Sequence, residues 1–343
     1  MEEKMSKRLV IIEVPQKDIK KIRKLGFKIA CIYEKGQNLR CGENSHQEAS
    51  FYKRIFPVTE EPCIGNADLI KEGKGLSFNN ILDSDAAIET IKEFSEPTCV
   101  IIKHTTPCGI ASAENLLQAW KDAYATDNDS PFGGIVSFNR ELDEDLAKEL
   151  SNYFLEVIIA ARFNEEALSI LGKKKKLRLI ELKGLNGDIN RKGSQFRSVV
   201  GGLLAQERDT WNNGKENWEI VTKKKTSEED LISMEFAVRC IKHVKSNAVL
   251  FVKGKRTVAI GGGQTARVDA VWIATHKGKE NIKGSIMASD AFFPFRDAVD
   301  VAAKAKVKAI IQPGGSIRDG EVIQAANEHN IAMAFSGQRY FKH

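Results

Sequence analysis

A lysine and a histidine stand side by side directly after a short apolar segment. Lys103 and His104 follow Cys99–Ile102, whose length and composition are typical of a buried strand, and they precede the polar residues 105–109. Lysine supplies a positive charge, and histidine exchanges a proton near neutral pH. Because ligands of open α/β sheets bind beyond the carboxyl ends of strands, this position favours acid–base chemistry. A surface loop that happens to contain both residues is the alternative interpretation.

Two further segments have residues suited to binding an anion. Arg40 opens a polar loop, residues 40–47, and its planar guanidinium group is suited to bidentate contact with phosphate. Ser246-Asn247 precedes two apolar segments and then Gly261–Gln264, where glycines between a strand and a helix let backbone amides approach an anion. The third glycine of the dinucleotide-binding fingerprint is missing there. A solvated turn and a tight glycine turn are the respective alternatives.

Two segments near the C-terminal end of the sequence complete the set. Ser289–Asp297 contains three phenylalanines around a proline, with Asp290 and Asp297 as acceptors, which suits a flat aromatic ligand with polar edges. Pro313–Ser316 follows a predicted strand and precedes a predicted helix, and Arg339 lies further on. A satellite core cluster and a solvated tail residue are the alternatives for the aromatic segment and for Arg339.

Composition and length indicate a globular enzyme of two domains. The chain has 343 residues, of which 42% are hydrophobic and 29% charged, and its net charge of +6 is too mild to predict nucleic-acid binding. Six cysteines without a CxxC pair indicate a reducing compartment, so we expect a cytoplasmic protein. The first apolar run, Leu9–Val14, is too short for a signal peptide or a membrane span.

Alternating apolar and amphipathic segments predict an α/β fold with a largely buried sheet. The predicted strands are Leu9–Val14, Lys28–Tyr33, Cys99–Ile102, Gly134–Phe138, Val157–Ala161, Leu177–Leu182, Ala248–Val252, Val258–Ile260, Ser285–Ala288, Val307–Ile311 and Ile331–Phe335. The predicted helices are Ala86–Phe94, Glu114–Ala125, Leu142–Phe154, Glu165–Leu171, Glu228–Val244, Val268–Ala274, Ala298–Ala305 and Glu321–Glu328. The polar, glycine-containing stretch Lys183–Ser194 predicts a boundary between subdomains 1–190 and 191–343.

In this order, the segments resemble the transformylase part of the bifunctional purine-biosynthesis protein family, which formylates 5-aminoimidazole-4-carboxamide ribonucleotide (AICAR). The resemblance runs from about Arg40 to His343 and includes Phe132-Gly133-Gly134 and Lys242–Ala248. Its most specific part is Ser289–Asp297. The family's cyclohydrolase part precedes this region and has no counterpart here, which predicts a stand-alone transformylase without IMP cyclohydrolase activity.

The resemblance implies the fold, the reaction and the partners. It implies two cytidine-deaminase-like α/β subdomains in an intertwined homodimer, with active sites shared between the subunits. It implies transfer of the formyl group of 10-formyltetrahydrofolate to the 5-amino group of AICAR, and neither nucleic acid nor membrane as a partner. Family members sometimes hold a monovalent cation such as K⁺, which the sequence leaves open. Zinc is not expected, because Pro107-Cys108 does not continue as the P-C-x-x-C of zinc deaminases.

The resemblance also implies roles for individual residues. His104 matches the proton acceptor, Lys103 matches the transition-state stabiliser, and Asn247 assists them. The residues matched to the nucleotide site are Arg40, Cys41, Phe132, Gly133, Glu156, Phe292 and Arg339. The residues matched to folate contacts are Val268, Asp297, Ser316 and Ile317.

Four departures from the family pattern bear on substrate preference. Cys41 replaces a tyrosine, Ser45 and Ala161 each replace a proline, and Glu156 replaces a nucleotide-binding aspartate. Two other functions therefore stay open: a hydrolytic deaminase on the same fold, and a non-catalytic nucleotide-binding homologue. The joint presence of Lys103, His104 and Asn247 favours the enzyme.

Overall fold

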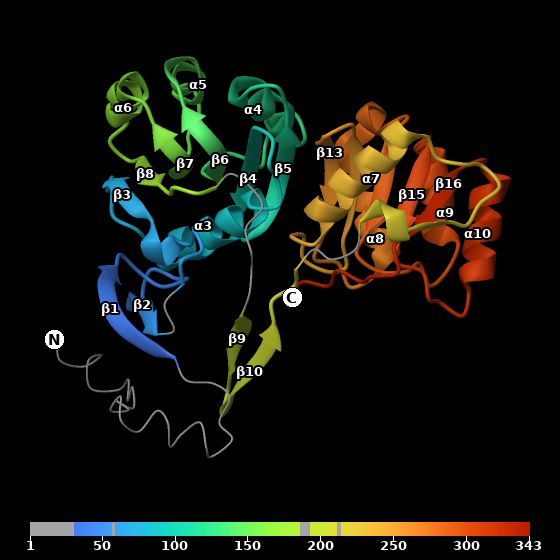
Figure 1. The fold of residues 1–343 in the computed structure, drawn as a ribbon, viewed down its shortest axis with the longest axis horizontal. Coiled ribbons are helices and arrows are strands. Elements are labelled where there is room, and N and C mark those ends of the chain that lie inside the picture. The colour runs from blue at the N-terminus through green and yellow to red at the C-terminus, as the bar shows by residue number, and fades with distance from the viewer. Residues whose placement is uncertain (1–30, 57–58, 186–192, 211–213) are drawn as a thin grey trace. The chain divides into compact units, whose positions relative to one another are not determined.

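The computed structural model describes residues 31–56, 59–185, 193–210 and 214–343 (Figure 1). The chain divides into a small unit, residues 1–61 with 75–79, and a large unit, residues 62–74 with 80–343. The predicted strand Leu9–Val14 and the first half of the predicted strand Lys28–Tyr33 lie outside the described residues, as do both residues that flank the predicted boundary at 190/191. That boundary stays a prediction.

The small unit is built around an antiparallel hairpin. Strands β1 (Ile32–Leu39) and β2 (Ala49–Phe56) pair, and the polar loop 40–47 joins them. The backbone fixes the loop within this unit, because Arg40 N donates to Leu76 O (2.9 Å) and Phe78 N donates to Cys41 O (3.0 Å). The loop prediction is therefore confirmed, whereas strand β2 was not predicted.

Most of the large unit is a tandem repeat of ten elements. The first half contains β3 (Asp68–Lys71), α3 (Phe78–Ile91), β4 (Thr98–Lys103), β5 (Thr106–Ser112), α4 (Leu116–Tyr124), β6 (Ile135–Leu142), α5 (Glu144–Leu150), β7 (Val157–Phe163), α6 (Glu165–Gly172) and β8 (Arg178–Glu181). The second half contains β11 (Glu219–Ile220), α7 (Glu228–Ile241), β12 (Val249–Lys253), β13 (Arg256–Gly261), α8 (Arg267–Gly278), β14 (Ile286–Ser289), α9 (Asp297–Lys304), β15 (Ala309–Gln312), α10 (Asp319–Glu328) and β16 (Ala332–Phe335).

Shorter elements interrupt this order. Three 3₁₀ helices are η1 (Ile64–Asn66), η2 (Lys215–Asn217) and η3 (Lys279–Ile282). Between the halves, β9 (Ser194–Val199) and β10 (Gly202–Glu207) pair antiparallel as a separate ribbon. A hairpin that the sequence did not predict therefore begins at Ser194, the last residue of the predicted polar break.

Twelve of the described strands form one sheet, in the order β11-β16-β15-β14-β12-β13-β5-β4-β6-β7-β8-β3. In each half an antiparallel hairpin is followed by three parallel strands, and the first strand of the half adds an antiparallel edge. The halves meet at β5 and β13, where Ser112 N donates to Lys255 O (2.8 Å) and Ile110 N donates to the Thr257 hydroxyl (2.9 Å). The predicted α/β class is confirmed as a mixed sheet.

Helices cover both faces of each half. Alternate strand residues such as Cys99, Ile101 and Phe138 pack with α4, α5 and α6 in one core cluster. The intervening residues Val100 and Ile102 are equally buried, and their side chains point to the opposite face of the sheet, as the period of two requires. The second half repeats this arrangement with α8, α9 and α10 in one cluster (Figure 1). Both strand faces are therefore buried, which explains the continuous apolar runs in the sequence.

The predicted strands and helices are otherwise confirmed within the described residues, with shifts at their ends. The Asn164 side chain caps α6 by accepting from Ala167 N (2.8 Å), at the helix start that was predicted. Gly254 lies in the turn between the antiparallel strands β12 and β13 with a φ of +58°, a conformation that glycine adopts readily. The sequence predicted no strand at β3, at β11 or at Thr106–Ser112, which is strand β5.

Candidate active site

The Lys-His pair lies at a two-residue hairpin turn. Lys103 ends β4 and pairs with Thr106, the first residue of β5. His104 and Thr105 form the turn in the left-handed region, with φ values of 54° and 61°. That conformation costs about 1–2 kcal/mol for each residue with a Cβ atom. The turn therefore needs compensating contacts.

A carboxylate on α3 supplies those contacts. Asp83 Oδ2 accepts from His104 N (3.2 Å), and Asp83 Oδ1 accepts from Thr105 N (2.6 Å). Hydrogen bonds to a charged group contribute about 1.5–3 kcal/mol each, enough to offset the strain of the turn. Burial raises the pKa of Asp83, whereas the amides of Thr105 and His104 lower it.

The Lys103 ammonium group is fixed on a neighbouring turn. Its Nζ donates to the carbonyl oxygen of Phe132 at 2.6 Å. The next residue, Gly133, has a φ of +71° and donates its N–H to Phe154 O (2.8 Å). The Phe132 ring is 69% exposed, and its centroid lies 4.9 Å from that of Phe154. Lys103 and two of the predicted nucleotide contacts are thus brought together.

Glu156, directly before strand β7, lies beside the Phe132-Gly133-Gly134 turn. Its backbone N donates to Gly134 O (3.1 Å), directly before β7. Its Oε2 accepts from Asn80 Nδ2 (2.8 Å) and lies 3.4 Å from Nη1 of the buried Arg178. The sequence analysis identified neither Asn80 nor Arg178. A glutamate therefore occupies this position with its carboxylate already oriented.

These residues lie at the carboxyl end of β4 and at the amino ends of the parallel strands β6 and β7. Strand β4 is antiparallel to β6, so Ile102 near its carboxyl end pairs with Ile135 at the start of β6. Ile135 in turn pairs with Val157 at the start of β7. The predicted place of Lys103 and His104 at the carboxyl end of their own strand is therefore confirmed, although the neighbouring strand β6 runs in the opposite direction.

In the second half, Asn247 has all its amide hydrogens engaged. Its Nδ2 donates to Gln264 O (2.9 Å) and to Thr265 O (3.0 Å). Its Oδ1 accepts from Arg267 Nη2 (2.8 Å). An amide oxygen has two lone pairs, so Asn247 can offer a ligand an acceptor but no donor. The side chain is therefore fixed in one orientation.

Arg267 is the centre of a buried network that the sequence analysis missed. Its guanidinium group pairs with Asp290 through Nη1 and donates from Nε to Phe292 O (3.1 Å). The second Asp290 oxygen accepts from the Ser246 hydroxyl (2.6 Å). Asp290 is fully buried, so its predicted role as a ligand acceptor is wrong. It holds Arg267, because a buried carboxylate needs a charged partner.

The aromatic segment Ser289–Asp297 has both predicted features, since part of it is exposed as a possible ligand platform and part of it lies in the core. Phe293 is buried in the core cluster, whereas Phe292 and Phe295 are 39% and 48% exposed. Arg318 lies over the Phe295 ring, with its guanidinium carbon 4.7 Å from the centroid. Two exposed rings thus form the platform, and the third ring anchors it.

The remaining predicted ligand contacts lie on short segments after β15 and β16 and at helix starts. Gly315 N and Ser316 N donate to Asp319 Oδ2 (2.7 and 3.1 Å), so these amides are already occupied by the chain's own carboxylate. Arg339 is exposed and lies over the Phe341 ring at 4.4 Å. The other three contacts are the half-buried Val268 in α8, the exposed Asp297 at the start of α9 and the fully exposed Ile317.

The sheet topology places the residues around Lys103 and the residues around Asn247 at the same edge of the sheet. Strands β6 and β14 run in opposite directions in the same sheet, because four antiparallel pairings and the β5–β13 junction separate them. The amino ends of β6–β8 therefore share an edge with the carboxyl ends of β14–β16. Four of the five segments with predicted chemistry lie there. The fifth contains Arg40 and Cys41 and belongs to the small unit.

In the second half, residues 340–342 form hydrogen bonds with several residues at this edge. Ser246 N donates to Lys342 O (2.9 Å), and Lys342 N donates to the Ser246 hydroxyl (3.1 Å). Lys342 Nζ donates to His243 O (3.3 Å), and Tyr340 N donates to Asp290 O (2.8 Å). The backbone before Asn247 is thus held from both sides.

A buried charged cluster joins the ends of α3 and α7. Glu93 Oε1 lies 3.0 Å from Lys242 Nζ and 2.9 Å from His243 Nε2, and all three side chains are at most 8% exposed. Glu93 and His243 occupy matching positions after their helices in the two halves of the repeat. Burial lowers the pKa of His243 to about 4, although the hydrogen bond with Glu93 opposes this shift.

This cluster predicts a pH dependence of stability. Unfolded histidine titrates near 6.5, so between pH 6.5 and 4 the unfolded chain binds a proton that the folded chain does not. Stability is complete above pH 6.5, and we expect His243 to reduce it by about 2 kcal/mol at pH 5. In urea denaturation, the free energy of unfolding should fall less between pH 7 and pH 5 for His243→Gln than for the unchanged protein. The exposed His276→Gln is the control, and equal losses in all three would contradict the assignment.

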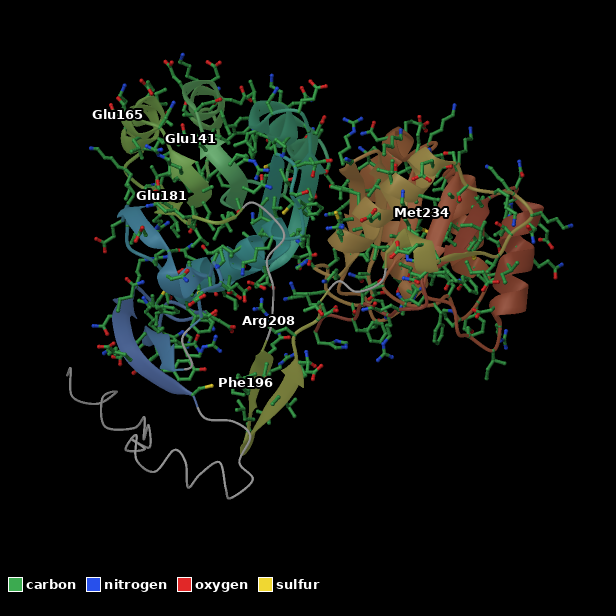
Figure 2. All side chains as sticks on the ribbon, in the orientation of Figure 1. Glu141, Glu165, Glu181, Phe196, Arg208 and Met234 are labelled. Carbon is green, nitrogen blue, oxygen red and sulfur yellow. The ribbon has the colours of Figure 1, made fainter. Side chains whose placement is uncertain are left out.

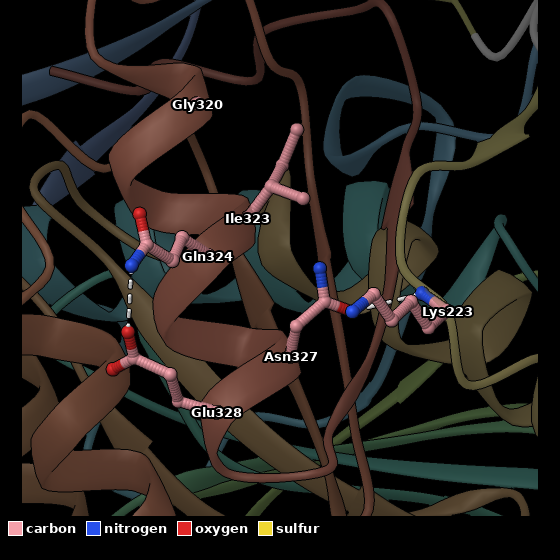
Figure 3. A pocket seen from close by; sticks show the side chains of 6 residues that line it. All are labelled: Lys223, Gly320, Ile323, Gln324, Asn327 and Glu328. Carbon is pink, nitrogen blue, oxygen red and sulfur yellow. Dashed lines mark hydrogen bonds between the residues drawn. The ribbon is translucent and has the colours of Figure 1, made fainter.

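One pocket lined by described residues lies away from the candidate site residues. It has a volume of about 460 Å³ and lies along α10, where Asn327 accepts from Lys223 N (2.8 Å) and Gln324 donates to Glu328 (Figure 3). A second pocket of about 260 Å³ is lined by Phe132, Phe154 and the aromatic rings of Tyr124 and Tyr153. Only the second pocket includes a predicted site residue.

The described residues contain no cluster of three or more His, Cys, Asp or Glu side chains that could hold a metal ion. None of their helices is both long enough and apolar enough to cross a bilayer.

The repeat and its polar edge define a mixed α/β protein with candidate site residues in both halves. The chain belongs to the AICARFT/IMPCHase bienzyme family, whose model matches residues 9–277. Similar proteins include the bifunctional purine biosynthesis protein PurH of Caldicellulosiruptor saccharolyticus, which is 51% identical over 307 residues. PurH of Persephonella marina is 49% identical over 317 residues, and PurH of Acetivibrio thermocellus is 47% identical over 315 residues.

Coverage differs between this chain and its relatives. The matches cover 90–92% of this chain but only 59–61% of those proteins. The chain therefore spans about three fifths of the length of the relatives it matches. Among solved structures, Acinetobacter baumannii RibD matches 30% of this chain and 33% of its own, with a TM-score of 0.23 and 16% identity, too low a likeness to assign a fold.

Proposed function

We propose that this chain transfers the formyl group of 10-formyltetrahydrofolate to the 5-amino group of AICAR, giving FAICAR and tetrahydrofolate in purine biosynthesis. The main support is the shared sheet edge, which carries Lys103, His104 and Glu156 from one half and Asn247 and Phe292 from the other. Family membership supplies the substrates. The relatives named as bifunctional purine biosynthesis proteins support the pathway.

The chemistry requires a base and a positive charge. The amine of AICAR is a weak nucleophile, because its lone pair is delocalised into the imidazole ring. His104 is exposed on its turn and would take the amine proton as the C–N bond forms. Lys103 uses one of its three N–H groups on Phe132 O, so two can stabilise the developing oxyanion. Asn247 would accept from a substrate N–H, because its own hydrogens are engaged.

The surrounding residues would bind the two substrates. Glu156 would accept from the ribose hydroxyls through Oε1, since its protein contacts use Oε2. The exposed rings of Phe132 and Phe292 would contact the nucleotide base and the pterin. Arg40, Cys41, Gly133 and Arg339 complete the proposed nucleotide site. Val268, Asp297, Ser316 and Ile317 make up the proposed folate site.

The test is direct turnover. Incubation of the purified chain with AICAR and 10-formyltetrahydrofolate should release tetrahydrofolate, and omission of AICAR should abolish the release. Ammonia release from the nucleotide, without folate turnover, would instead identify a deaminase. Tight AICAR binding without either product would identify a non-catalytic homologue.

We further propose a cytoplasmic homodimer of two cytidine-deaminase-like subdomains per chain. All six cysteines are free thiols, consistent with a reducing compartment. The ribbon β9–β10 supports the dimer. Val200, Leu203 and Leu204 in and beside it are more than half exposed, and its strands pair only with each other among the described strands (Figure 2, Phe196). An isolated two-stranded hairpin is marginal in water, so a second copy is the proposed occupant of its apolar surface.

A charge placed on this ribbon should dissociate the dimer. Leu204→Glu would bury an unpaired carboxylate in the interface, and we expect sedimentation velocity to show a shift from dimer to monomer. Gln206→Glu adds the same charge two residues on, on the same strand face, at a position that is already polar. This control should stay dimeric. A monomeric unchanged protein, or equal behaviour of both variants, would exclude the ribbon as the interface.

A further inference from the structure

We infer that Asp83 is a positioning residue for the formyl transfer proposed above: its carboxylate fixes the His104–Thr105 turn and thereby aims the His104 side chain at the reacting amine. The reaction and its substrate are taken from the proposed function, whereas the role of Asp83 is inferred from its hydrogen bonds to the turn.

The turn depends on this one side chain. Both of its backbone amides donate to Asp83, one to each carboxylate oxygen. The Thr105 hydroxyl donates to His104 O (2.7 Å), so the turn's other contact is internal. Because both turn residues have positive φ, neither conformation is favoured without a partner. The backbone angles of His104 set the direction of its Cα–Cβ bond, so the carboxylate that holds them also aims the imidazole.

The same face of α3 also holds a second part of the site. Asn80 lies three residues before Asp83, and residues with this spacing are neighbours on a helix. Asn80 donates to Glu156, the proposed ribose contact. One rigid helix therefore fixes the separation between the proposed base and the proposed nucleotide ligand. Positioning of this kind is needed, because small displacements from attack geometry reduce turnover strongly.

The experiment compares three variants with the unchanged protein. Asp83→Asn keeps one acceptor but opposes the other amide with an NH₂ group. We expect kcat to fall by about 10²-fold, with KM for AICAR nearly unchanged. Asp83→Glu restores the carboxylate and should recover part of kcat. Asp85→Asn makes the same change of charge in the same helix, away from the turn, and should retain the kcat of the unchanged protein.

A spectroscopic readout separates positioning from general stability. In ¹³C-histidine-labelled protein without substrates, the imidazole cross-peak of His104 should shift in Asp83→Asn, while those of the other five histidines stay in place. An unshifted His104 peak, or parallel losses in kcat, KM and melting temperature, would overturn the inference. If the unchanged protein lacks formyl transfer altogether, the proposed function fails, and the cross-peak still reports whether Asp83 fixes the turn.

Discussion

Replacement of His104 by alanine is expected to lower kcat for AICAR formylation by about 10²- to 10⁴-fold. The imidazole lies on the turn that β4 and β5 present at the polar edge. Without it, the amine proton must leave to water while the C–N bond forms. KM for AICAR should change little, because the proposed nucleotide contacts lie on other segments, among them Phe132-Gly133 and Glu156. Steady-state kinetics with both substrates varied would measure the two effects separately.

The control for this variant is another exposed histidine. His276 lies on α8 and stacks on Trp272 with ring centroids 5.5 Å apart, away from the turn. His276→Ala should retain the kcat of the unchanged protein. If His104→Ala also retained it, His104 would not be the base, and Lys103 would have to act with a different acceptor. A large rise in KM at constant kcat would instead make His104 a binding residue.

Periodicity was sufficient to predict most helices and the apolar strands in their order, but not the short strands β3, β5 and β11 or the edge at which the predicted residues meet. Strands such as Val157–Phe163 and Ala309–Gln312 have apolar runs long enough to be found from the sequence alone. Their direction relative to β4 depends on pairings between distant residues, such as Arg256 with Ala111. Local sequence contains no information on such pairings. The sequence therefore did not show that Lys103 lies beside the amino ends of β6 and β7, whereas Ser289–Asp297 follows the carboxyl end of β14.

The helix that positions the site was predicted only in part. Apolar spacing indicated a helix over Ala86–Phe94, whereas α3 begins at Phe78. Phe78, Asn79 and Asn80 have low helix propensity, so the first turns gave no signal. Polar residues three apart, Asn80 and Asp83, in the turn before an apolar helix could have indicated a shared polar face. Their partners, Glu156 and the His104 turn, are visible only in three dimensions.

The buried ion pair was missed for a different reason. Arg267 had no predicted role, and Asp290 was predicted to be an acceptor for a ligand. Charged residues beside glycines and aromatics are typical of ligand sites, and sequence alone does not reveal whether such a charge is satisfied internally. The structure shows both charges buried and paired, with the site residues arranged around them. Some charged residues that resemble ligand contacts in the sequence are therefore buried, and they hold the neighbouring site residues in place.

Asp290→Ala is expected to destabilise the protein by about 3–5 kcal/mol, because it leaves the Arg267 guanidinium group buried without its partner. The double variant Arg267→Met/Asp290→Leu removes both charges and should recover most of that loss. Urea denaturation would measure both changes. Arg162→Ala removes the exposed pair with Glu141 (3.5 Å; Glu141 is labelled in Figure 2) and should cost at most about 1 kcal/mol.

Stability and activity should separate in the double variant, and this separation tests what the pair is for. Asn247 Oδ1 and Phe292 O both lose their donor when Arg267 is replaced, even though the core is refilled. We therefore expect the rate of formyl transfer in the double variant to stay as low as in Asp290→Ala. Its free energy of unfolding in urea should nevertheless be close to that of the unchanged protein. Recovery of both properties together would mean that Arg267 only fills space. Continued instability would mean that the buried pair is needed for the fold itself, and that its contacts to Asn247 and Phe292 follow from that need.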